Sequence, residues 1–170
     1  MKNFTEISPR DIKSNVFDLI ADNWMLITAE KDGKTNTMTA SWGGLGHLWH
    51  KDVAYIFIRP QRFTKEFVDS AENFSLTFFD SSYKEKLRYL GATSGRDEDK
   101  IAKAGLTIAH DSSTPYFKES ELAFICKKAY FQPFEESCFI DKSHIDKHYP
   151  EKDFHVLYIG EVLKVLKAEV

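Results

Sequence analysis

The sequence has few of the features that define several large classes of protein. Its 170 residues include only two cysteines, Cys126 and Cys138, and no Cys-x-x-Cys pair. That spacing disfavours a disulfide or redox pair, so we expect two reduced, largely packed thiols. No apolar run approaches the roughly 20 residues that span a bilayer, and the N-terminus has no signal-peptide hydrophobic region. We therefore expect a cytoplasmic protein.

An excess of charge of one sign is also missing. The chain has 23 Lys and Arg against 26 Asp and Glu, a formal net charge of -3. A net charge this small gives no global basic field for nucleic acid or for an anionic membrane surface. Any anion must therefore be bound by a local group of residues.

What is present is apolar and aromatic content. The composition is 42% hydrophobic and 14% aromatic, with fourteen phenylalanines. At this length we expect one domain, residues 1–170, with a substantial core. Rings at this density suit a β-rich core and a flat-ring ligand equally well, so composition does not separate the two.

Hydrophobic periodicity predicts short strands with interspersed helices and no regular strand-helix alternation. This pattern favours a mainly β, predominantly antiparallel barrel with peripheral helices over a doubly wound sheet. Asp32-Gly33 is expected to be the turn of a hairpin, the segment 43–51 a loop, and Gly160 a bulge. The predicted strands are 24–29, 35–42, 53–59, 74–79, 106–109, 122–131 and 154–166; the predicted helices are 8–14, 15–21, 64–70, 81–90, 97–104 and 141–148.

One strand carries hydroxyls where a core strand would carry aliphatic residues. Segment 36–44 reads Asn-Thr-Met-Thr-Ala-Ser-Trp-Gly-Gly. Side chains alternate faces in a strand, so the hydroxyls at 37, 39 and 41 share one face. Short donors beside two glycines allow a ligand to approach the backbone closely. An exposed hairpin face is the alternative interpretation.

Positive charge follows one strand later. Segment 59–64 reads Arg-Pro-Gln-Arg-Phe-Thr, and Thr64 is predicted to cap a helix. Guanidinium groups, a hydroxyl and free N–H groups at a helix start together outline a phosphate site without a metal. The two segments therefore predict a site for a phosphate-bearing cofactor.

Histidines offer weaker candidates. His144 and His148 are four residues apart on a predicted helix, but without a third ligand a solvated face is the better interpretation, and we expect no metal. His155 opens an otherwise buried strand. It is either a strand-end histidine satisfied by backbone or part of the site.

Four segments, taken together, carry a family resemblance. They are 36–43, 59–64, 93–100 (Thr-Ser-Gly-Arg-Asp-Glu-Asp-Lys) and the strand from His155 to 162, which ends in Gly-Glu-Val. In this order they resemble the flavin reductase-like family of FMN-binding split barrels, which includes flavoredoxin-type proteins. The resemblance runs from about residue 15 to 165.

The resemblance implies an antiparallel split β-barrel that forms a homodimer with FMN near the interface. It implies an oxidoreductase that transfers hydride from NADH or NADPH to flavin, with a redox partner protein as a further possibility. Phe63 stands where a tyrosine is common, which removes a hydroxyl. By the resemblance, the cofactor-binding residues are Asn36, Thr37, Met38, Thr39, Ala40, Ser41, Trp42, Arg59, Arg62, Phe63, Thr64, Ser94, Gly95 and Lys100, and His155 is the candidate catalytic residue near the flavin or nicotinamide.

Three other functions remain open on sequence grounds. A non-enzymatic FMN carrier would move electrons between partners through the same site. A split-barrel binding module would have lost the flavin. A hydrolase using Ser41 is the most distant alternative, because the sequence places no base beside it.

Overall fold

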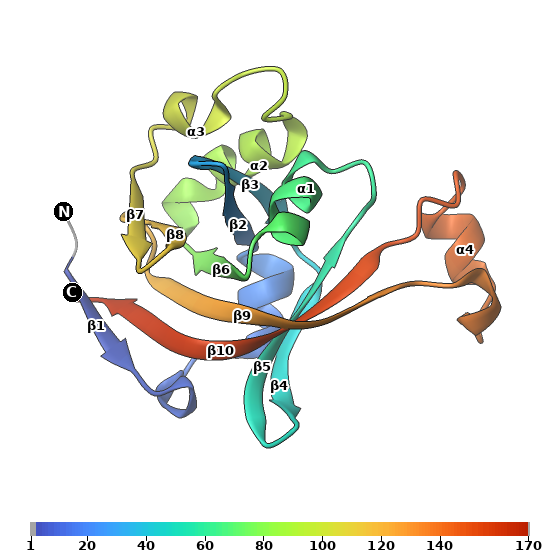
Figure 1. The fold of residues 1–170 in the computed structure, drawn as a ribbon, viewed down its shortest axis with the longest axis horizontal. Coiled ribbons are helices and arrows are strands. Elements are labelled where there is room, and N and C mark those ends of the chain that lie inside the picture. The colour runs from blue at the N-terminus through green and yellow to red at the C-terminus, as the bar shows by residue number, and fades with distance from the viewer. Residues whose placement is uncertain (1–2, 170) are drawn as a thin grey trace.

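The computed structural model describes residues 3–169, and antiparallel strands dominate it (Figure 1). Short helices lie on the outside of the sheet. The strands are β1 (Phe4–Ile7), β2 (Met25–Lys31), β3 (Lys34–Ala40), β4 (Gly43–Leu48), β5 (Lys51–Ile58), β6 (Asn73–Phe78), β7 (Ile108–Asp111), β8 (Thr114–Phe117), β9 (Leu122–Pro133) and β10 (Val156–Ala168). The helices are α1 (Phe63–Ser70), α2 (Lys84–Ala92), α3 (Lys100–Lys103) and α4 (Ser143–His148), with single turns at Pro9–Asp11, Asp18–Asp22, Ser81–Tyr83 and Glu136–Cys138.

Within residues 3–169 the main sheet has eight strands. Seven follow the order β3-β2-β6-β9-β10-β5-β4, β1 pairs with β10, and β7 and β8 form a separate hairpin. Every pairing is antiparallel, as the sequence predicts. The long strands β9 and β10 cross the molecule together and lead into an arm that carries α4 (Figure 1). The predicted mainly β fold with peripheral helices is confirmed.

The β2-β3 hairpin has the predicted turn. Asp32 and Gly33 both have positive φ, 51° and 72°, which is the backbone that a two-residue primed turn requires. Register is then fixed along the whole hairpin, from Lys31 opposite Lys34 to Met25 opposite Ala40. With this pairing, the C-terminal end of β3 lies close to the C-terminal end of β5.

The predicted loop at 43–51 is wrong, because most of it is strand β4. The glycines there are needed for close packing: a Cβ on Gly46 would lie 3.1 Å from the Tyr55 ring of β5. Glycine is usually depleted in strands, which is why the sequence pattern suggested a loop. The true turn is confined to Trp49 and His50, both with positive φ.

Other boundaries also differ from prediction. The helix predicted at 97–104 begins only after Asp99, whose side chain accepts from the Ala102 N–H and caps α3. The helix predicted at 8–14 is only a single turn, and β1 and β8 are strands that the sequence pattern missed. The predicted bulge is present, since register shifts between Ile159 and Gly160. Cys126 is free and buried, whereas Cys138 is free but exposed, so only the first thiol is packed as expected.

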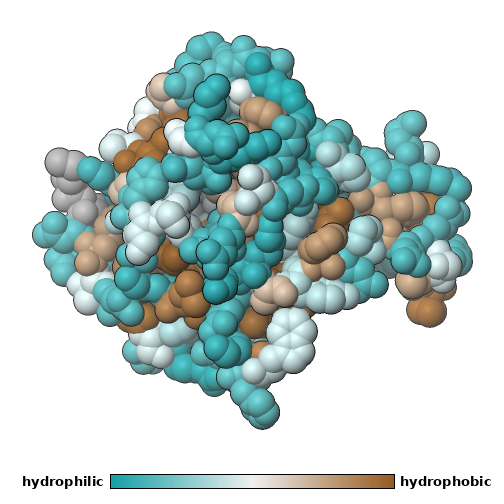
Figure 2. All heavy atoms as spheres, viewed as in Figure 1, coloured by the Kyte–Doolittle hydropathy of each residue, from teal (hydrophilic) through white to brown (hydrophobic). Residues whose placement is uncertain are grey.

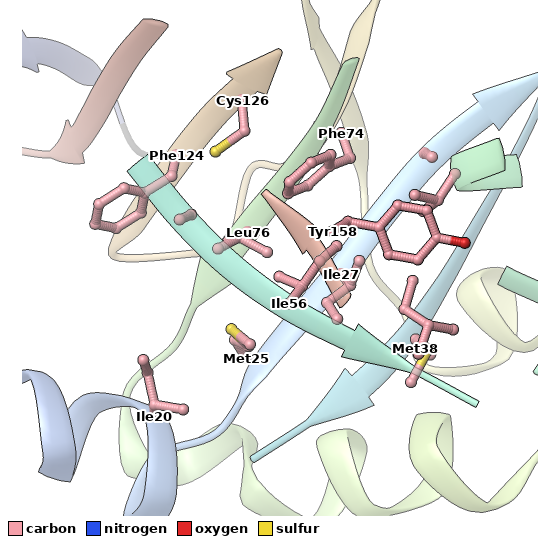
Figure 3. Close-up of a cluster of buried hydrophobic side chains, with 14 of the residues drawn as sticks. Ile20, Met25, Ile27, Met38, Ile56, Phe74, Leu76, Phe124, Cys126 and Tyr158 are labelled. Carbon is pink, nitrogen blue, oxygen red and sulfur yellow. The ribbon is translucent and has the colours of Figure 1, made fainter. Parts of the chain in front are cut away.

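The main core lies inside the curved sheet (Figure 3). Its side chains come from strands distant in sequence and include Met25 and Ile27 of β2, Ile56 of β5, Phe74 of β6 and Tyr158 of β10. A second cluster, with Leu26, Leu87 and Leu90, packs α2 and α3 against the outside of β2. These two clusters fix α2 and the following loop over β3, where the site described below is built.

The surface is mainly hydrophilic in the view of Figure 2, with apolar patches that include part of the arm carrying α4. The exposed apolar side chains of the arm include Phe131 and Ile140. No helix within residues 3–169 is long and apolar enough to cross a membrane.

Candidate functional site

A cavity of about 420 Å³ lies where β3 ends beside the end of β5, and we call it the β3 cavity. One wall is the chain from Met38 to Trp42. The opposite side is formed by the β5 end and the turn that follows it, with Arg59 and Arg62. His155, which precedes β10, completes the lining. Both segments that the sequence singled out therefore face one cavity.

The turn between β5 and α1 explains how two arginines reach the same cavity. The Arg62 N–H donates to the Arg59 carbonyl at 3.1 Å, closing a turn with Pro60 at its second position. Gln61, at the third position, also lines the cavity. α1 then begins at Phe63 with Arg62 as its N-cap residue, so the predicted capping by Thr64 is wrong.

The threonines of β3 bond to protein rather than presenting free hydroxyls. The Thr39 Oγ1 donates to the Leu87 carbonyl of α2 at 2.5 Å. The Thr37 Oγ1 donates to the Ile27 carbonyl at 3.1 Å and pairs with Thr28. In contrast, the hydroxyl of Ser41 makes no hydrogen bond to residues 3–169. Ser41 and the backbone of 40–42 are therefore the polar groups that this wall offers a ligand.

Two cations, the part-buried Arg62 and the buried Lys100, lie beside the cavity. The Arg62 Nη1 donates to the Gly91 carbonyl at 3.0 Å, and the Lys100 Nζ donates to the Leu90 and Thr93 carbonyls at 2.8 Å each. Neither cation forms an ion pair with any of residues 3–169. Burial, together with the charge of Arg62, lowers the pKa of Lys100 to about 8. The site thus brings together two positive charges that no carboxylate of residues 3–169 neutralises in an ion pair.

The end of α2 balances this charge only in part. The C-terminal carbonyls of a helix carry about half a negative elementary charge, and cations are favoured beside them. Arg62 and Lys100 together bring two positive charges to this end. Burial and the charge of Arg59 also lower the pKa of Arg62. The remaining positive charge favours an anion, which would also relieve the repulsion.

A second cavity of about 1020 Å³ lies beyond this pair, between α1 and the segment leading through α3, and we call it the α3 cavity. Lys100, Asn36, Phe63 and Gly95 line it. The Asn36 Nδ2 donates to the Thr64 Oγ1 at 2.9 Å, and a Cβ on Gly95 would collide with the Asn36 Oδ1. Glycine at position 95 therefore allows the loop to lie directly against β3.

Arg59 has a carboxylate partner. Its Nη1 lies 2.5 Å from the Asp153 Oδ2, and its Nη2 donates to the His148 carbonyl at 2.7 Å. Gln61 donates to the same Asp153 oxygen at 2.6 Å. These two side chains fasten the segment after α4 to the rim of the β3 cavity. Arg62 is thus less neutralised by its surroundings than Arg59.

His155 is buried and uncharged at neutral pH. Burial, with the nearby charge of Arg59, lowers the pKa of His155 to about 4. Its Nδ1 lies 2.8 Å from the Tyr149 hydroxyl, and its ring centroid is 5.2 Å from that of Trp42. The hydrogen-bond partner of the His155 ring is therefore a tyrosine side chain. The exposed Trp42 indole contacts both His155 and His148.

The residues expected from sequence thus fall into three groups. One group lines the β3 cavity, a second lines the α3 cavity, and the third lines neither. The first contains Met38, Thr39, Ala40, Ser41, Trp42, Arg59, Arg62 and His155; the second contains Asn36, Phe63, Gly95 and Lys100; the third contains Thr37, Thr64 and Ser94.

Sequence reasoning missed two residues that line the β3 cavity, Phe57 and Gln61. Phe57 is two residues before Arg59, so strand alternation places both on one face. Gln61 stands between the two arginines of the turn. Both signals were present in the sequence. The Asp153 contact had no such signal, because it joins residues 94 positions apart.

The residues present fit a flavin mononucleotide. A flat ring needs one wall of backbone and small side chains and another of apolar rings, which 40–42, Phe57 and Trp42 supply. A phosphate needs charge-assisted donors, which Arg62 and Lys100 can supply because neither is in an ion pair with a carboxylate of residues 3–169. The donor chemistry therefore matches the two ends of FMN.

Comparison with known proteins supports the same family. A family model described as a flavin reductase like domain matches residues 17–169. Comparison with curated proteins gave no match.

Solved structures resemble the fold over nearly the whole chain. An FMN-binding domain of a flavin reductase-like enzyme from Shewanella baltica has a TM-score of 0.71 at 15% identity, covering 98% of this chain and 78% of that one. A flavoredoxin from Methanosarcina acetivorans has a TM-score of 0.67 at 20% identity, covering 94% and 75%. An NADH:FAD oxidoreductase from Streptomyces globisporus, in complex with NAD and FAD fragments, has a TM-score of 0.65 at 12% identity, covering 86% and 77%. At such identities the likeness is evidence for the fold alone.

Proposed function

This chain belongs to the flavin reductase-like family, and from that premise we propose that it is an FMN-dependent oxidoreductase using NADH or NADPH as electron donor. The observation that carries the proposal is a pair of cations, the part-buried Arg62 and the buried Lys100, which lacks a carboxylate partner within residues 3–169. Arg62 lines the β3 cavity. We further propose that residues 1–170 act as one domain and work in the cytoplasm.

In this proposal the chain binds and orients the cofactor. Arg62 and Lys100 hold the phosphate, and the backbone of 40–42 with Ser41 lies along the ring edge. Arg59 stays fixed by Asp153 at the rim and adds positive charge. FMN, when bound, supplies the hydride and electron transfer chemistry, so the protein needs no nucleophile of its own.

His155 and Trp42 have a distinct role in the same proposal. His155 is uncharged at neutral pH, because burial lowers its pKa to about 4. It therefore places a neutral ring, held by Tyr149, at the edge of the cavity. Trp42 is half-exposed beside it and offers an indole face to a nicotinamide. Both residues shield the reacting face from water rather than transferring a proton.

We also propose that the protein is a homodimer with the site near its interface. Exposed aromatic side chains support this: Trp49 of the β4-β5 turn and Tyr130 of β9 have ring centroids 6.3 Å apart. Aromatic residues exposed together are typical of protein interfaces. Sedimentation of the wild type and of Trp49→Ser/Tyr130→Ser tests this. We expect the wild type to have the mass of a dimer and the double variant that of a monomer. Equal masses for the two proteins would contradict the proposal.

Stopped-flow mixing tests the activity. The purified protein is reconstituted with FMN and mixed without oxygen with NADH or NADPH, and flavin absorbance is followed. We expect bleaching with one donor well above the free-FMN background. Bleaching at background with flavin firmly bound would instead indicate an electron carrier that is reduced by a partner protein. A protein that binds no flavin would indicate a binding module, and both outcomes would contradict the proposed reductase.

A further inference from the structure

We propose that Tyr149 is a positioning residue that fixes the proton of the His155 ring on Nε2, so that His155 presents a hydrogen-bond donor to the β3 cavity. The ligand group that meets this ring is then an acceptor, either a carbonyl oxygen or an unprotonated ring nitrogen. The inference deepens the proposed function and rests on it, because the ligand considered is the flavin ring. Tyr149 itself does not line the cavity, so it acts through His155.

Tyr149 and His155 are both held in place by the arm that carries α4. Tyr149 is 4% exposed, and its ring packs against Phe139 and Phe154 at centroid distances of 5.8 and 5.1 Å. The backbone of His155 is also fixed, because its carbonyl accepts from the Phe134 N–H at 2.8 Å. Buried side chains that pack on several rings keep one orientation. The two side chains therefore meet in the same geometry before any ligand binds.

The Tyr149 hydroxyl has one proton, and His155 offers its only acceptor within residues 3–169. The hydroxyl oxygen lies 2.8 Å from the His155 Nδ1 and makes no other hydrogen bond in the described chain. With the ring proton on Nδ1 instead, the buried phenol proton would have no acceptor, which costs free energy. The phenol therefore donates to Nδ1. A neutral imidazole that accepts at Nδ1 carries its single proton on Nε2.

The charges around His155 keep a second proton off the ring. The Arg59 guanidinium lies 5.1 Å from the centroid of the Tyr149 ring, and Arg62 lines the same cavity as His155. Asp153 acts in the opposite direction, but its carboxylate is engaged by Arg59. Burial, with the charge of Arg59, lowers the pKa of His155 to about 4. At neutral pH the ring therefore has one N–H donor, and its acceptor nitrogen is occupied by the tyrosine.

Nε2 is the ring nitrogen that remains for a ligand. It makes no hydrogen bond to any residue from 3 to 169, yet the protein does not enclose it, so it opens on the space beside it. The cavity that His155 lines is the β3 cavity, where Ser41, Trp42 and Phe57 form other parts of the wall. An oxidised flavin ring has carbonyl oxygens and unprotonated nitrogens along its edge, all of which accept hydrogen bonds. An Nε2–H donor complements that edge, whereas a bare nitrogen would repel it.

Nitrogen NMR of the apo-protein, with its histidines isotopically labelled, tests the tautomer directly, because protonated and unprotonated ring nitrogens have well-separated shifts. His155→Gln identifies the signals by their loss. We expect Nε2 of the wild type to be protonated and Nδ1 to be unprotonated. Tyr149→Phe keeps the aromatic ring but removes the hydroxyl, so both signals should move to the intermediate shifts of mixed tautomers. The pKa of His155 should also rise from about 4 toward its ordinary value, because a hydrogen bond to the neutral form is lost. Tyr89→Phe, which removes a hydroxyl that donates to Glu98, is the control and should match the wild type.

Titration of the same samples with FMN tests the donor. We expect FMN to shift the Nε2 signal of His155, and Tyr149→Phe to bind FMN about tenfold more weakly than the wild type and Tyr89→Phe do. A wild-type His155 protonated on Nδ1 would overturn the inference, and this spectrum decides the point even if Tyr149→Phe fails to fold. Unchanged ring signals in Tyr149→Phe, or FMN that binds without moving the Nε2 signal, would overturn it as well. Failure of the proposed function would appear differently, as a wild-type protein that ignores FMN while its apo form still carries the proton on Nε2.

Discussion

Arg62 and Lys100 donate to neighbouring carbonyls at the end of α2, those of Gly91 and Leu90, at 3.0 and 2.8 Å. Their charges repel each other across this short distance, and the repulsion contributes to the lowered pKa of Lys100. A helix end attracts cations, but not strongly enough to balance two of them. An anionic ligand would complete the balance, which is why we propose that the pair marks the site.

The first prediction concerns Arg62. Arg62→Ala should weaken FMN binding by about 1.5–3 kcal/mol, the value of a hydrogen bond to a charged group. The dissociation constant measured by quenching of flavin fluorescence should rise about 10- to 100-fold. Arg88→Ala is the matched control, because Arg88 is an exposed arginine of α2 that pairs with Glu85 and lines neither cavity. Equal effects of the two substitutions on FMN binding would contradict the assignment of Arg62 to the FMN phosphate.

The second prediction concerns the proton of Lys100. Burial and Arg62 lower its pKa to about 8, so the folded apo-protein loses this proton before the unfolded chain does. The stability of the apo-protein should therefore rise with pH between about 8 and 10.4, where the unfolded state binds more protons. FMN binding needs the charged form, so FMN affinity should fall as pH rises through about 8.

The Lys100→Arg variant distinguishes the loss of FMN affinity caused by deprotonation of Lys100 from other effects of alkaline pH on the protein. An arginine stays charged in this range, so the variant should bind FMN with little change in affinity from about pH 7 to 9.5. Lys100→Met should bind weakly at every pH. A wild-type affinity that stays constant across this range would show that Lys100 does not contact the phosphate.

The sequence predicted the parts of the site that depend on local pattern. The hairpin turn at Asp32-Gly33, the strand character of β3 and the strand that leads to Arg59 are all encoded within a few residues. The structure brings these segments together because β2 and β5 occupy fixed places in one curved sheet.

Contacts between distant residues could not be read in the same way. The Asp153 carboxylate pairs with Arg59, which is 94 positions away in the sequence. The Leu87 carbonyl accepts a hydrogen bond from the Thr39 hydroxyl, 48 positions away. Each contact uses hydrogen-bonding groups that the Arg59 or Thr39 side chain could otherwise direct to a ligand. The glycines of β4 suggested a loop for another reason. An added Cβ would meet Met25 and the Tyr55 carbonyl at Gly43, and the Tyr55 ring at Gly46, so glycine is required there by tertiary packing.

The third prediction concerns acid stability. Burial and the charge of Arg59 lower the pKa of His155 to about 4, whereas an unfolded histidine titrates near 6.5. The unfolded state therefore binds more protons between these values, and stability should be lost as pH falls through that window. Urea unfolding at several pH values should show this dependence in the wild type and a smaller one in His155→Gln. His144→Gln, which alters an exposed histidine of α4, should behave as the wild type; if it instead matched His155→Gln, burial of His155 would not be the cause.

The fourth prediction concerns Gly95. A Cβ there would collide with the Asn36 Oδ1, so Gly95→Ala must displace Asn36 from Thr64. Overpacking of this kind costs about 1–3 kcal/mol, and the midpoint of thermal unfolding should fall accordingly. Gly44→Ala is the comparison, because its added Cβ would lie at an ordinary 3.4 Å from the Tyr55 ring. A Gly95→Ala protein as stable as Gly44→Ala would show that the loop does not lie against β3 as described.

Titration of the apo-protein with FMN, followed by the fluorescence of Trp42, tests the central claim most directly. Trp42 lines the β3 cavity, so a Trp24→Phe/Trp49→Phe protein reports on this indole alone. We expect saturable quenching at one FMN per chain, with the midpoint shifted to higher FMN concentration by Arg62→Ala. Fluorescence that does not respond to FMN, or quenching that Arg62→Ala leaves unchanged, would contradict a flavin site at the meeting of β3 and β5.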